Sequence, residues 1–228
     1  MQYPKFLKEG DVIQLVAPSF GCTSTPYYER LISAITYFKK NNYHINEGNN
    51  IWLNNKIASN SATERAKEIN EAFINSSDII ASVGGGEVMC DILEYLDYDI
   101  IKNHPKYFIG YSDNTNLTFL LNTICDMASI YGLNFPSFGL VPFDQSTYDT
   151  LALLKGEKLS FTNYPKYLLP NNLKYDPLYQ IPCDTDSVIK SYPTNEVIIS
   201  GRLIGGCLDI LVNLAGTNFD HVSSFCDK

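Results

Sequence analysis

Lys106-Tyr-Phe-Ile-Gly110-Tyr-Ser112-Asp-Asn114 has the pattern of a short buried strand that ends at a glycine and leads directly into a helix. Asp78-Ile-Ile-Ala-Ser-Val83 is a similar run that leads into three glycines, and a third buried strand is expected over 11–17. Short apolar runs that alternate with longer amphipathic ones are typical of βα units around a parallel sheet. The sequence therefore predicts an α/β fold with an N-terminal parallel-sheet domain.

Two sequence patterns between these strands predict where helices begin. Thr25 followed by Pro26 predicts a helix cap with proline in the first turn. Ser61 and Glu64 form a capping-box pattern, in which a hydroxyl and a carboxylate each satisfy a free backbone N–H. Two further helices are expected at 88–96 and 114–125.

Three parts are expected along the chain. Residues 1–140 carry the βα alternation, whereas 141–195 are rich in Pro, Asn, Asp and Tyr and predict an interdomain connection. A strand at 197–201 and a helix at 208–214 then start a new unit. Because few residues follow, 196–228 is expected to be the truncated beginning of a C-terminal domain.

The bulk composition excludes several classes of protein. Of 228 residues, 45% are hydrophobic and 18% are charged, which fits a globular protein. The net charge of -8, with scattered acidic residues, argues against a nucleic-acid or anionic-membrane partner. The first residues lack the apolar run of a signal peptide, and no stretch approaches the ~20 apolar residues of a membrane helix. A cytoplasmic location is therefore expected.

The six cysteines include no CxxC pair and no nearby histidine at metal-ligand spacing. This pattern favours free thiols in a reducing compartment over a disulfide framework or a zinc site. No metal site and no cofactor are predicted.

Ser112 is the sharpest candidate for chemistry. A serine just after a strand and just before a helix can expose its hydroxyl, while the N–H of Asp113 can face a developing oxyanion. Asn114 replaces the last glycine of the G-x-S-x-G pattern. Because G-x-S-D is also typical of an ordinary helix-capping serine, the local pattern leaves both readings open.

Three consecutive glycines, Gly84 to Gly86, end the run at 78–83. They allow backbone N–H groups to approach an oxyanion or a phosphate, although a plain tight turn is equally consistent with them. A dinucleotide fingerprint would need a glycine at Met89, and no Walker pattern is present. Carboxylates at 94, 97 and 99 fit an exposed helix end. No motif marks a general base among the three histidines His44, His104 and His221.

Further motifs occur in a fixed order over most of the chain: Val16–Ser19, Ser61–Ala66, Gly85-Gly86 with Leu93–Asp99, Pro105-Lys106, Phe108–Asp113, Gly201–Gly206 and Leu214–Thr217. Together they resemble the L,D-carboxypeptidase family of serine peptidases, and in particular its subgroup of microcin C immunity proteins. The resemblance implies an N-terminal domain similar to class I glutamine amidotransferases and a smaller β-rich C-terminal domain.

The same resemblance implies site residues and a reaction. Ser112 would be the nucleophile, the N–H groups of Gly86 and Asp113 the oxyanion hole, and Gly85 and Gly110 the supporting turn. An amide near a free carboxylate would be hydrolysed through an acyl-enzyme, without metal or cofactor. A murein peptide or an aminoacyl or peptidyl nucleotide is the expected substrate, and a homodimer the expected assembly.

Some features depart from the family. Cys207 stands where the family commonly has asparagine after the two glycines. The Tyr-Gly-Pro segment that is usual after the nucleophile helix is replaced by Tyr131-Gly-Leu-Asn-Phe-Pro136. The triad glutamate and histidine are expected beyond residue 228, so the chain by itself is expected to be nearly inactive. A non-catalytic binding or relic protein is the alternative. A glutaminase-like amidotransferase is disfavoured because Ser112 is not a cysteine.

Overall fold

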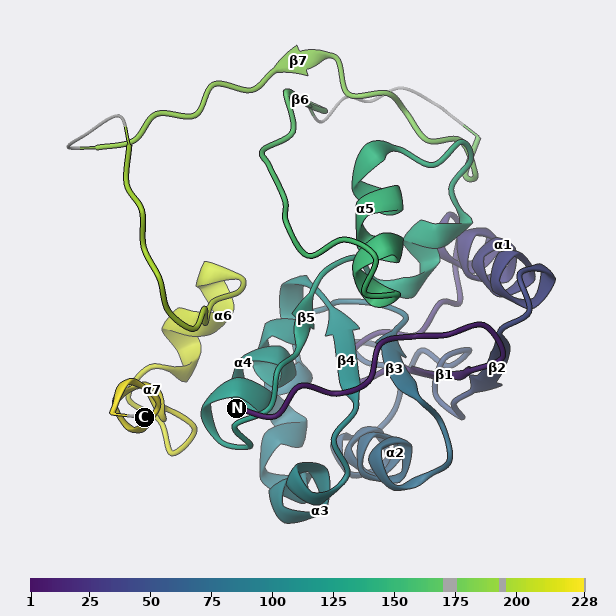
Figure 1. Cartoon of the computed structure of the whole chain (residues 1–228). Coiled ribbons are helices and arrows are strands. Elements are labelled where there is room, and N and C mark those ends of the chain that lie inside the picture. The colour runs from purple at the N-terminus through teal and green to yellow at the C-terminus, as the bar shows by residue number, and fades with distance from the viewer. Residues whose placement is uncertain (170–175, 193–195, 228) are drawn as a thin grey trace.

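The computed structural model describes residues 1–169, 176–192 and 196–227. A five-stranded parallel sheet with the strand order β2-β1-β3-β4-β5 stands at its centre, which confirms the predicted α/β fold (Figure 1). Two further strands form a small antiparallel sheet. The strands are β1 (Val12–Val16), β2 (His44–Glu47), β3 (Ile79–Ser82), β4 (Tyr107–Gly110), β5 (Ile130–Tyr131), β6 (Lys166–Tyr167) and β7 (Thr185–Asp186).

Both faces of the parallel sheet are covered, because alternate residues of the central strands enter separate hydrophobic clusters. α1 (Tyr27–Lys40) packs on one face, and α2 (Ala62–Ile74) and α4 (Thr115–Thr123) pack on the other. The strand residues on the α1 face are Ile13, Leu15, Ile79, Ala81, Tyr107, Ile109 and Ile130. Those on the other face are Val16, Ile80 and Phe108.

Shorter helices complete the described fold. They are α3 (Tyr98–Asn103), α5 (Gln145–Leu154), α6 (Leu208–Leu214), α7 (Val222–Cys226) and the 3₁₀ helices η1 (Met89–Tyr95), η2 (Ser112–Asn114) and η3 (Phe135–Gly139). The helix expected at 88–96 is therefore a 3₁₀ helix, and that at 208–214 is confirmed. None of the helices in the described ranges is long and apolar enough to cross a membrane.

The predicted helix caps are only partly correct. The Ser61 hydroxyl accepts the N–H of Glu64, as predicted, but the N–H of Ser61 donates to the Asn60 side chain instead of Glu64. α1 begins without a side-chain cap, because its N-cap residue is Pro26, which has no hydrogen-bonding side chain. Thr25, predicted as the cap, lies one residue earlier, and its hydroxyl donates to the Glu29 carboxylate at 2.6 Å.

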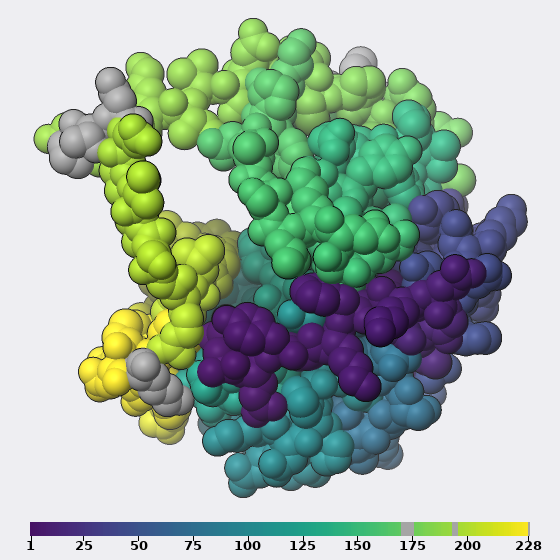
Figure 2. Space-filling view, in the orientation of Figure 1, coloured from purple at the N-terminus to yellow at the C-terminus, as the bar shows by residue number. Residues whose placement is uncertain are grey.

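The strand predicted at 197–201 is wrong. These residues are exposed and lie outside any strand of the described chain, because no neighbouring strand pairs with them. Figure 2 shows residues 196–206 as an arm that runs down to α6, with an opening between its upper part and the rest of the molecule. Near its lower end the arm contacts the body, where Arg202 pairs with Asp126. Beyond the arm, α6 and α7 return to pack against α4 (Figure 1).

Candidate active site

Ser112 lies two residues after the end of β4, at the carboxyl edge of the sheet. Its φ of 62° places a residue other than glycine in the left-handed region. This conformation costs about 1–2 kcal/mol, so the surrounding structure must hold it in place. One such contact is the hydrogen bond from the Ser112 N–H to the Tyr131 hydroxyl, at 3.2 Å. A strained serine between a strand and a helix is the geometry that exposes a nucleophilic hydroxyl.

The glycine loop after β3 lies against this serine. β3 and β4 are parallel neighbours, so the loops at their carboxyl ends meet at one edge of the sheet. A Cβ added at Gly85 would lie 3.2 Å from the Ser112 Cβ and 3.4 Å from its Oγ. A Cβ at Gly86 would collide with the Ser19 hydroxyl. A side chain is therefore excluded at Gly86 and would be crowded at Gly85, where the backbone lies close to the serine.

Backbone donors remain available beside Ser112. Within the described part of the chain, the N–H groups of Gly86 and Asp113 have no hydrogen-bond acceptor. The position of a Cβ on Gly85, only 3.7 Å from the Asp113 nitrogen, shows how closely the two loops approach. Unpaired N–H groups next to a nucleophile can serve as oxyanion donors.

Because Gly110 has no side chain, Asn114 can pack against it and connect the turn after β4 to the glycine loop after β3. A Cβ on Gly110 would lie 2.7 Å from the Asn114 Cγ. The Asn114 amide donates to the carbonyls of Gly84, at 2.9 Å, and Tyr111, at 3.1 Å. Asn114 thus ties the turn after β4 to the glycine loop, a role that its place in the G-x-S-x-G pattern did not reveal.

The Asp113 carboxylate is a buried anchor, with the residue only 1% exposed. It accepts hydrogen bonds from the Ser19 hydroxyl at 2.5 Å, the Met89 N–H at 2.9 Å and the Asn116 amide at 2.9 Å. Donors from three separate segments therefore converge on one side chain. This fixes the residue whose backbone N–H is the oxyanion-donor candidate.

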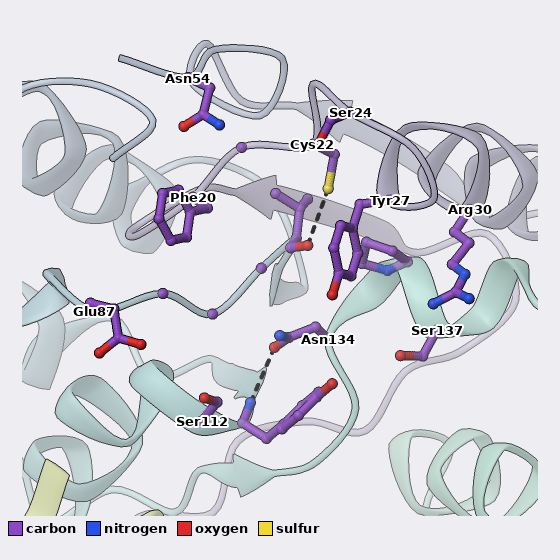
Figure 3. Close-up of a pocket in the computed structure, with 17 residues that line it drawn as sticks. Phe20, Cys22, Ser24, Tyr27, Arg30, Asn54, Glu87, Ser112, Asn134 and Ser137 are labelled. Atoms are coloured by element: carbon purple, nitrogen blue, oxygen red, sulfur yellow. Dashed lines mark hydrogen bonds between the residues drawn. The ribbon is translucent and has the colours of Figure 1, made fainter. Parts of the chain in front are cut away.

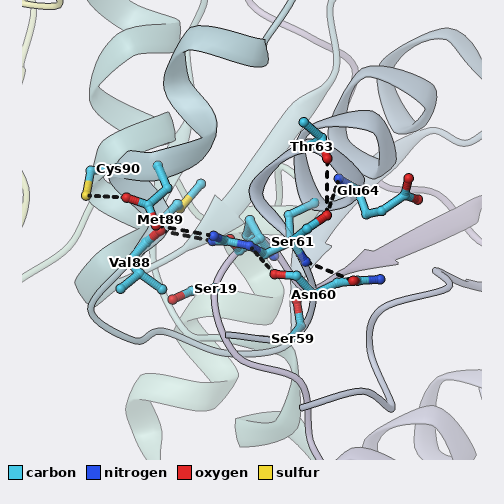
Figure 4. A network of polar contacts seen from close by, with 12 residues as sticks. Ser19, Ser59, Asn60, Ser61, Thr63, Glu64, Val88, Met89 and Cys90 are labelled. Carbon is cyan, nitrogen blue, oxygen red and sulfur yellow. Dashed lines mark hydrogen bonds and ion pairs between the residues drawn. The ribbon is translucent and has the colours of Figure 1, made fainter. Parts of the chain in front are cut away.

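Arg65 reinforces the same region from α2. Figure 4 shows the polar network around it, in which Asn60 and Val88 are labelled. Arg65 is 2% exposed and donates to three backbone carbonyls. They belong to Pro18 at 2.7 Å, Val88 at 3.0 Å and Asn60 at 3.0 Å. A planar guanidinium can hold several carbonyls at fixed angles, so Arg65 locks the loops after β1 and β3 to each other. Its position within the Ser61–Ala66 motif gave no indication of this role.

A cavity of about 540 Å³ opens in front of Ser112 (Figure 3). It is bounded by the loops after β1, β3 and β4 and by the first turns of α1. Aromatic side chains of Phe20, Tyr27 and Tyr111 line it together with the charged residues Arg30 and Glu87. Size and lining are those of a small-molecule site.

The cavity contains one thiol, that of Cys22. Burial raises the pKa of Cys22 to about 12, and its Sγ donates to the Val83 carbonyl. The thiol is therefore protonated near neutral pH and a poor nucleophile. Among the described residues, no histidine lines the cavity, and no group of three or more His, Cys, Asp or Glu side chains could hold a metal ion.

Comparison with known proteins shows clear relatives. The LD-carboxypeptidase N-terminal domain family matches residues 13–132. A Vibrio cholerae protein named as a carboxypeptidase is 30% identical over 96% of this chain and 66% of its own length. The microcin C7 self-immunity protein MccF of Escherichia coli is 28% identical, over 93% of this chain and 63% of its own length. The chain thus spans a little less than two thirds of these curated relatives.

Solved structures agree with the sequence relatives. The crystal structure of an MccF-like protein from Bacillus anthracis matches with a TM-score of 0.63 and 30% identity, over 68% of this chain and 47% of that chain. A mutant of MccF in complex with adenosine monophosphate matches with a TM-score of 0.72 and 24% identity, over 95% of this chain and 66% of that chain. At that identity the second match supports the fold.

Proposed function

We propose, from the premise that this chain belongs to the LD-carboxypeptidase family, that Ser112 is the nucleophile of a serine-type amide hydrolase. The observation that carries the proposal is the left-handed backbone of Ser112, held at the mouth of the cavity with Gly85 against it. Strain of this kind is maintained only where the surrounding structure imposes it, and it is concentrated at functional sites.

In this proposal the Ser112 Oγ attacks the carbonyl carbon of an amide. The carbonyl oxygen gains negative charge, and the N–H groups of Gly86 and Asp113 donate to it. The C–N bond then breaks, the amine leaves with a proton, and an ester remains on Ser112. Water hydrolyses that ester, which releases the carboxylic acid and restores the serine hydroxyl.

A general base must accept the Ser112 proton. In the described chain no histidine lies at the cavity, and the family resemblance assigns the triad glutamate and histidine to a C-terminal domain. We therefore propose that residues 1–228 supply the nucleophile and the oxyanion donors, and that the base comes from outside them. On this proposal the chain by itself turns over substrate very slowly.

The proposed substrate is a murein peptide or an aminoacyl or peptidyl nucleotide. The similarity to MccF and the complex of MccF with adenosine monophosphate favour the nucleotide. The aromatic residues Phe20, Tyr27 and Tyr111 line the cavity and offer ring faces on which a base can stack. A homodimer remains part of the proposal through the family resemblance.

The test is a hydrolysis assay with the protein as its gene encodes it. A murein tetrapeptide and an aminoacyl phosphoramidate of adenosine, in which an amide joins the aminoacyl group to the nucleotide, are offered to the wild type, to Ser112→Ala and to Ser223→Ala, whose serine is exposed on α7. Loss of a nucleophile costs about 10³-fold or more in kcat. Equal turnover by Ser112→Ala and the wild type would overturn the proposal. Tight binding without turnover by the wild type would support the non-catalytic alternative.

A further inference from the structure

Arg30 is the one cationic side chain that lines the cavity among the described residues. It projects from the first turns of α1. Figure 3 shows Arg30 with Tyr27 and Ser137 on one side of the cavity, and Ser112 and Glu87 on the other. The cavity therefore has a positive end and a negative end.

The Arg30 guanidinium is held in place through one nitrogen. Its Nε donates to the Pro177 carbonyl at 2.7 Å. The segment around Pro177 is itself fastened, because the Val141 N–H donates to the Leu178 carbonyl and the Gln180 N–H donates to the Val141 carbonyl. Arg30 is thus positioned by backbone contacts that use only part of its hydrogen-bonding capacity.

The remaining donors of Arg30 have no anionic partner among the residues that the structure describes. Within the described ranges, its two Nη atoms have no hydrogen-bond acceptor, and no carboxylate lies within 4.0 Å of the guanidinium. The charge nevertheless acts inside the cavity. Burial and the neighbouring Tyr27 raise the pKa of Tyr111, and Arg30 opposes that rise. A half-buried cation without a counter-ion is a ready partner for an anionic ligand.

We propose that Arg30 binds an oxyanion of the substrate, the carboxylate of a peptide or the phosphate of a nucleotide, while Ser112 faces the amide. This inference rests on the proposed function and adds the residue that binds the anionic group of the substrate. Two free Nη atoms can hold two oxygens of one carboxylate or phosphate in parallel. Glu87 repels the same group from the opposite side, so the two charges orient the substrate in one direction.

The test measures binding and needs no turnover. The 228-residue chain is titrated with N-acetyl-D-alanine and its neutral primary amide, and with adenosine monophosphate and neutral adenosine. The Arg30 Nε–H resonance is followed by NMR. We expect a saturable shift with at least one anion and about tenfold or weaker binding of its neutral counterpart, since charge-assisted hydrogen bonds are the stronger ones. The anion that is preferred over its neutral counterpart identifies a carboxylate or a phosphate.

Variants separate a direct contact from a change in structure. Arg30→Gln should bind the anion and its neutral counterpart equally, whereas Arg30→Lys should keep part of the preference. Arg202→Gln removes a cation that pairs with Asp126 outside the cavity and should keep all of it. Equal affinities for anion and neutral ligand in the wild type, or no shift with either anion, would overturn the inference. Ser112→Ala should retain the preference for the anion. A failure of the proposed catalytic role of Ser112 can therefore be distinguished from a failure of anion binding by Arg30.

Discussion

The Ser19 hydroxyl donates a 2.5 Å hydrogen bond to the Asp113 carboxylate, and so joins the loop after β1 to the turn after β4. The Met89 N–H reaches the same carboxylate oxygen from the segment that follows the glycine loop. Asp113 therefore combines two functions in one residue. Its buried carboxylate holds three loops together, and its backbone N–H is the oxyanion-donor candidate beside Ser112.

Replacing the Asp113 carboxylate should destabilise the whole edge of the sheet. In Asp113→Asn, one side-chain oxygen becomes an NH₂ group, which cannot accept a hydrogen bond. In either orientation of the amide, the donors on one side, Ser19 with Met89 or Asn116, lose their acceptor. We expect the free energy of unfolding to fall by about 2 kcal/mol, the scale of a buried hydrogen bond to a charged group. Denaturant unfolding measures this. The exposed Asp99 gives the matched control Asp99→Asn, which should change stability by no more than about 0.5 kcal/mol.

The backbone strain at Ser112 predicts that a glycine at this position is more stable than an alanine, which is the reverse of the order expected for a serine inside a helix. Because φ is 62°, Ser112→Gly should be more stable than Ser112→Ala by about 1 kcal/mol, although both remove the hydroxyl. Thermal and denaturant unfolding of the two variants give the comparison directly.

Ser33, inside α1, provides the control for this order. There the helical backbone favours alanine over glycine by about 1 kcal/mol, so Ser33→Ala should be the more stable of its pair. An alanine variant at Ser112 as stable as the glycine variant would show that the position is not strained.

Lys106 predicts a pH dependence of stability. Its Nζ donates to the carbonyls of Ala72 and Asn75 at the end of α2, and burial lowers its pKa from 10.5 to about 8. Between these two values the unfolded chain binds a proton that the folded chain lacks. The contribution of Lys106 to stability should therefore rise with pH above about 8 and be constant below it.

The comparison with Lys106→Met isolates this effect. The variant leaves carbonyls at the end of α2 unpaired, so it should lose about 1–3 kcal/mol near neutral pH. The difference in unfolding free energy between wild type and variant should then widen from pH 8 to 9.5. Buried groups such as Cys22, whose raised pKa lowers stability at alkaline pH, are present in both wild type and variant. Their contribution therefore cancels in the difference between the two unfolding free energies. A constant difference over this range would contradict the lowered pKa.

The strands that could be predicted from the sequence are those in which nearly every residue is buried. β1, β3 and β4 are buried on both faces, so each appears as a largely apolar run, interrupted in β1 by Gln14. β2 was missed because it is an edge strand of mostly exposed residues, His44–Glu47. The run at 197–201 has the local composition of a strand but no pairing partner, and composition alone cannot supply one.

Site residues could be predicted only where a short, local sequence motif identifies them. Ser112 and the glycines belong to local motifs, and the structure brings them together at neighbouring strand ends. Arg65 and Arg30 act through carbonyls that are far away in sequence, those of Pro18 and Pro177. Such contacts depend on the tertiary arrangement of loops, which no residue spacing encodes.

The exposed arm at 196–206 predicts self-association of this chain. Ile198, Ile199 and Leu203 are 90%, 85% and 91% exposed, which gathers apolar surface on an extended segment whose residues 197–201 lie outside every strand of the described chain. Such a segment can add to a sheet edge or an apolar surface of a second copy. Sedimentation velocity should show an average mass that rises with concentration.

Two substitutions test whether the arm itself is responsible. Ile198→Lys combined with Ile199→Lys should abolish the concentration dependence, because each places a charge where apolar contact and strand pairing would occur. Ile57→Lys, at an exposed apolar residue outside the arm, should leave the association unchanged. A wild-type chain that sediments as a monomer at every concentration would contradict the prediction. Association that survives the double substitution would place the contact elsewhere, since the apolar surface of the arm would then be dispensable.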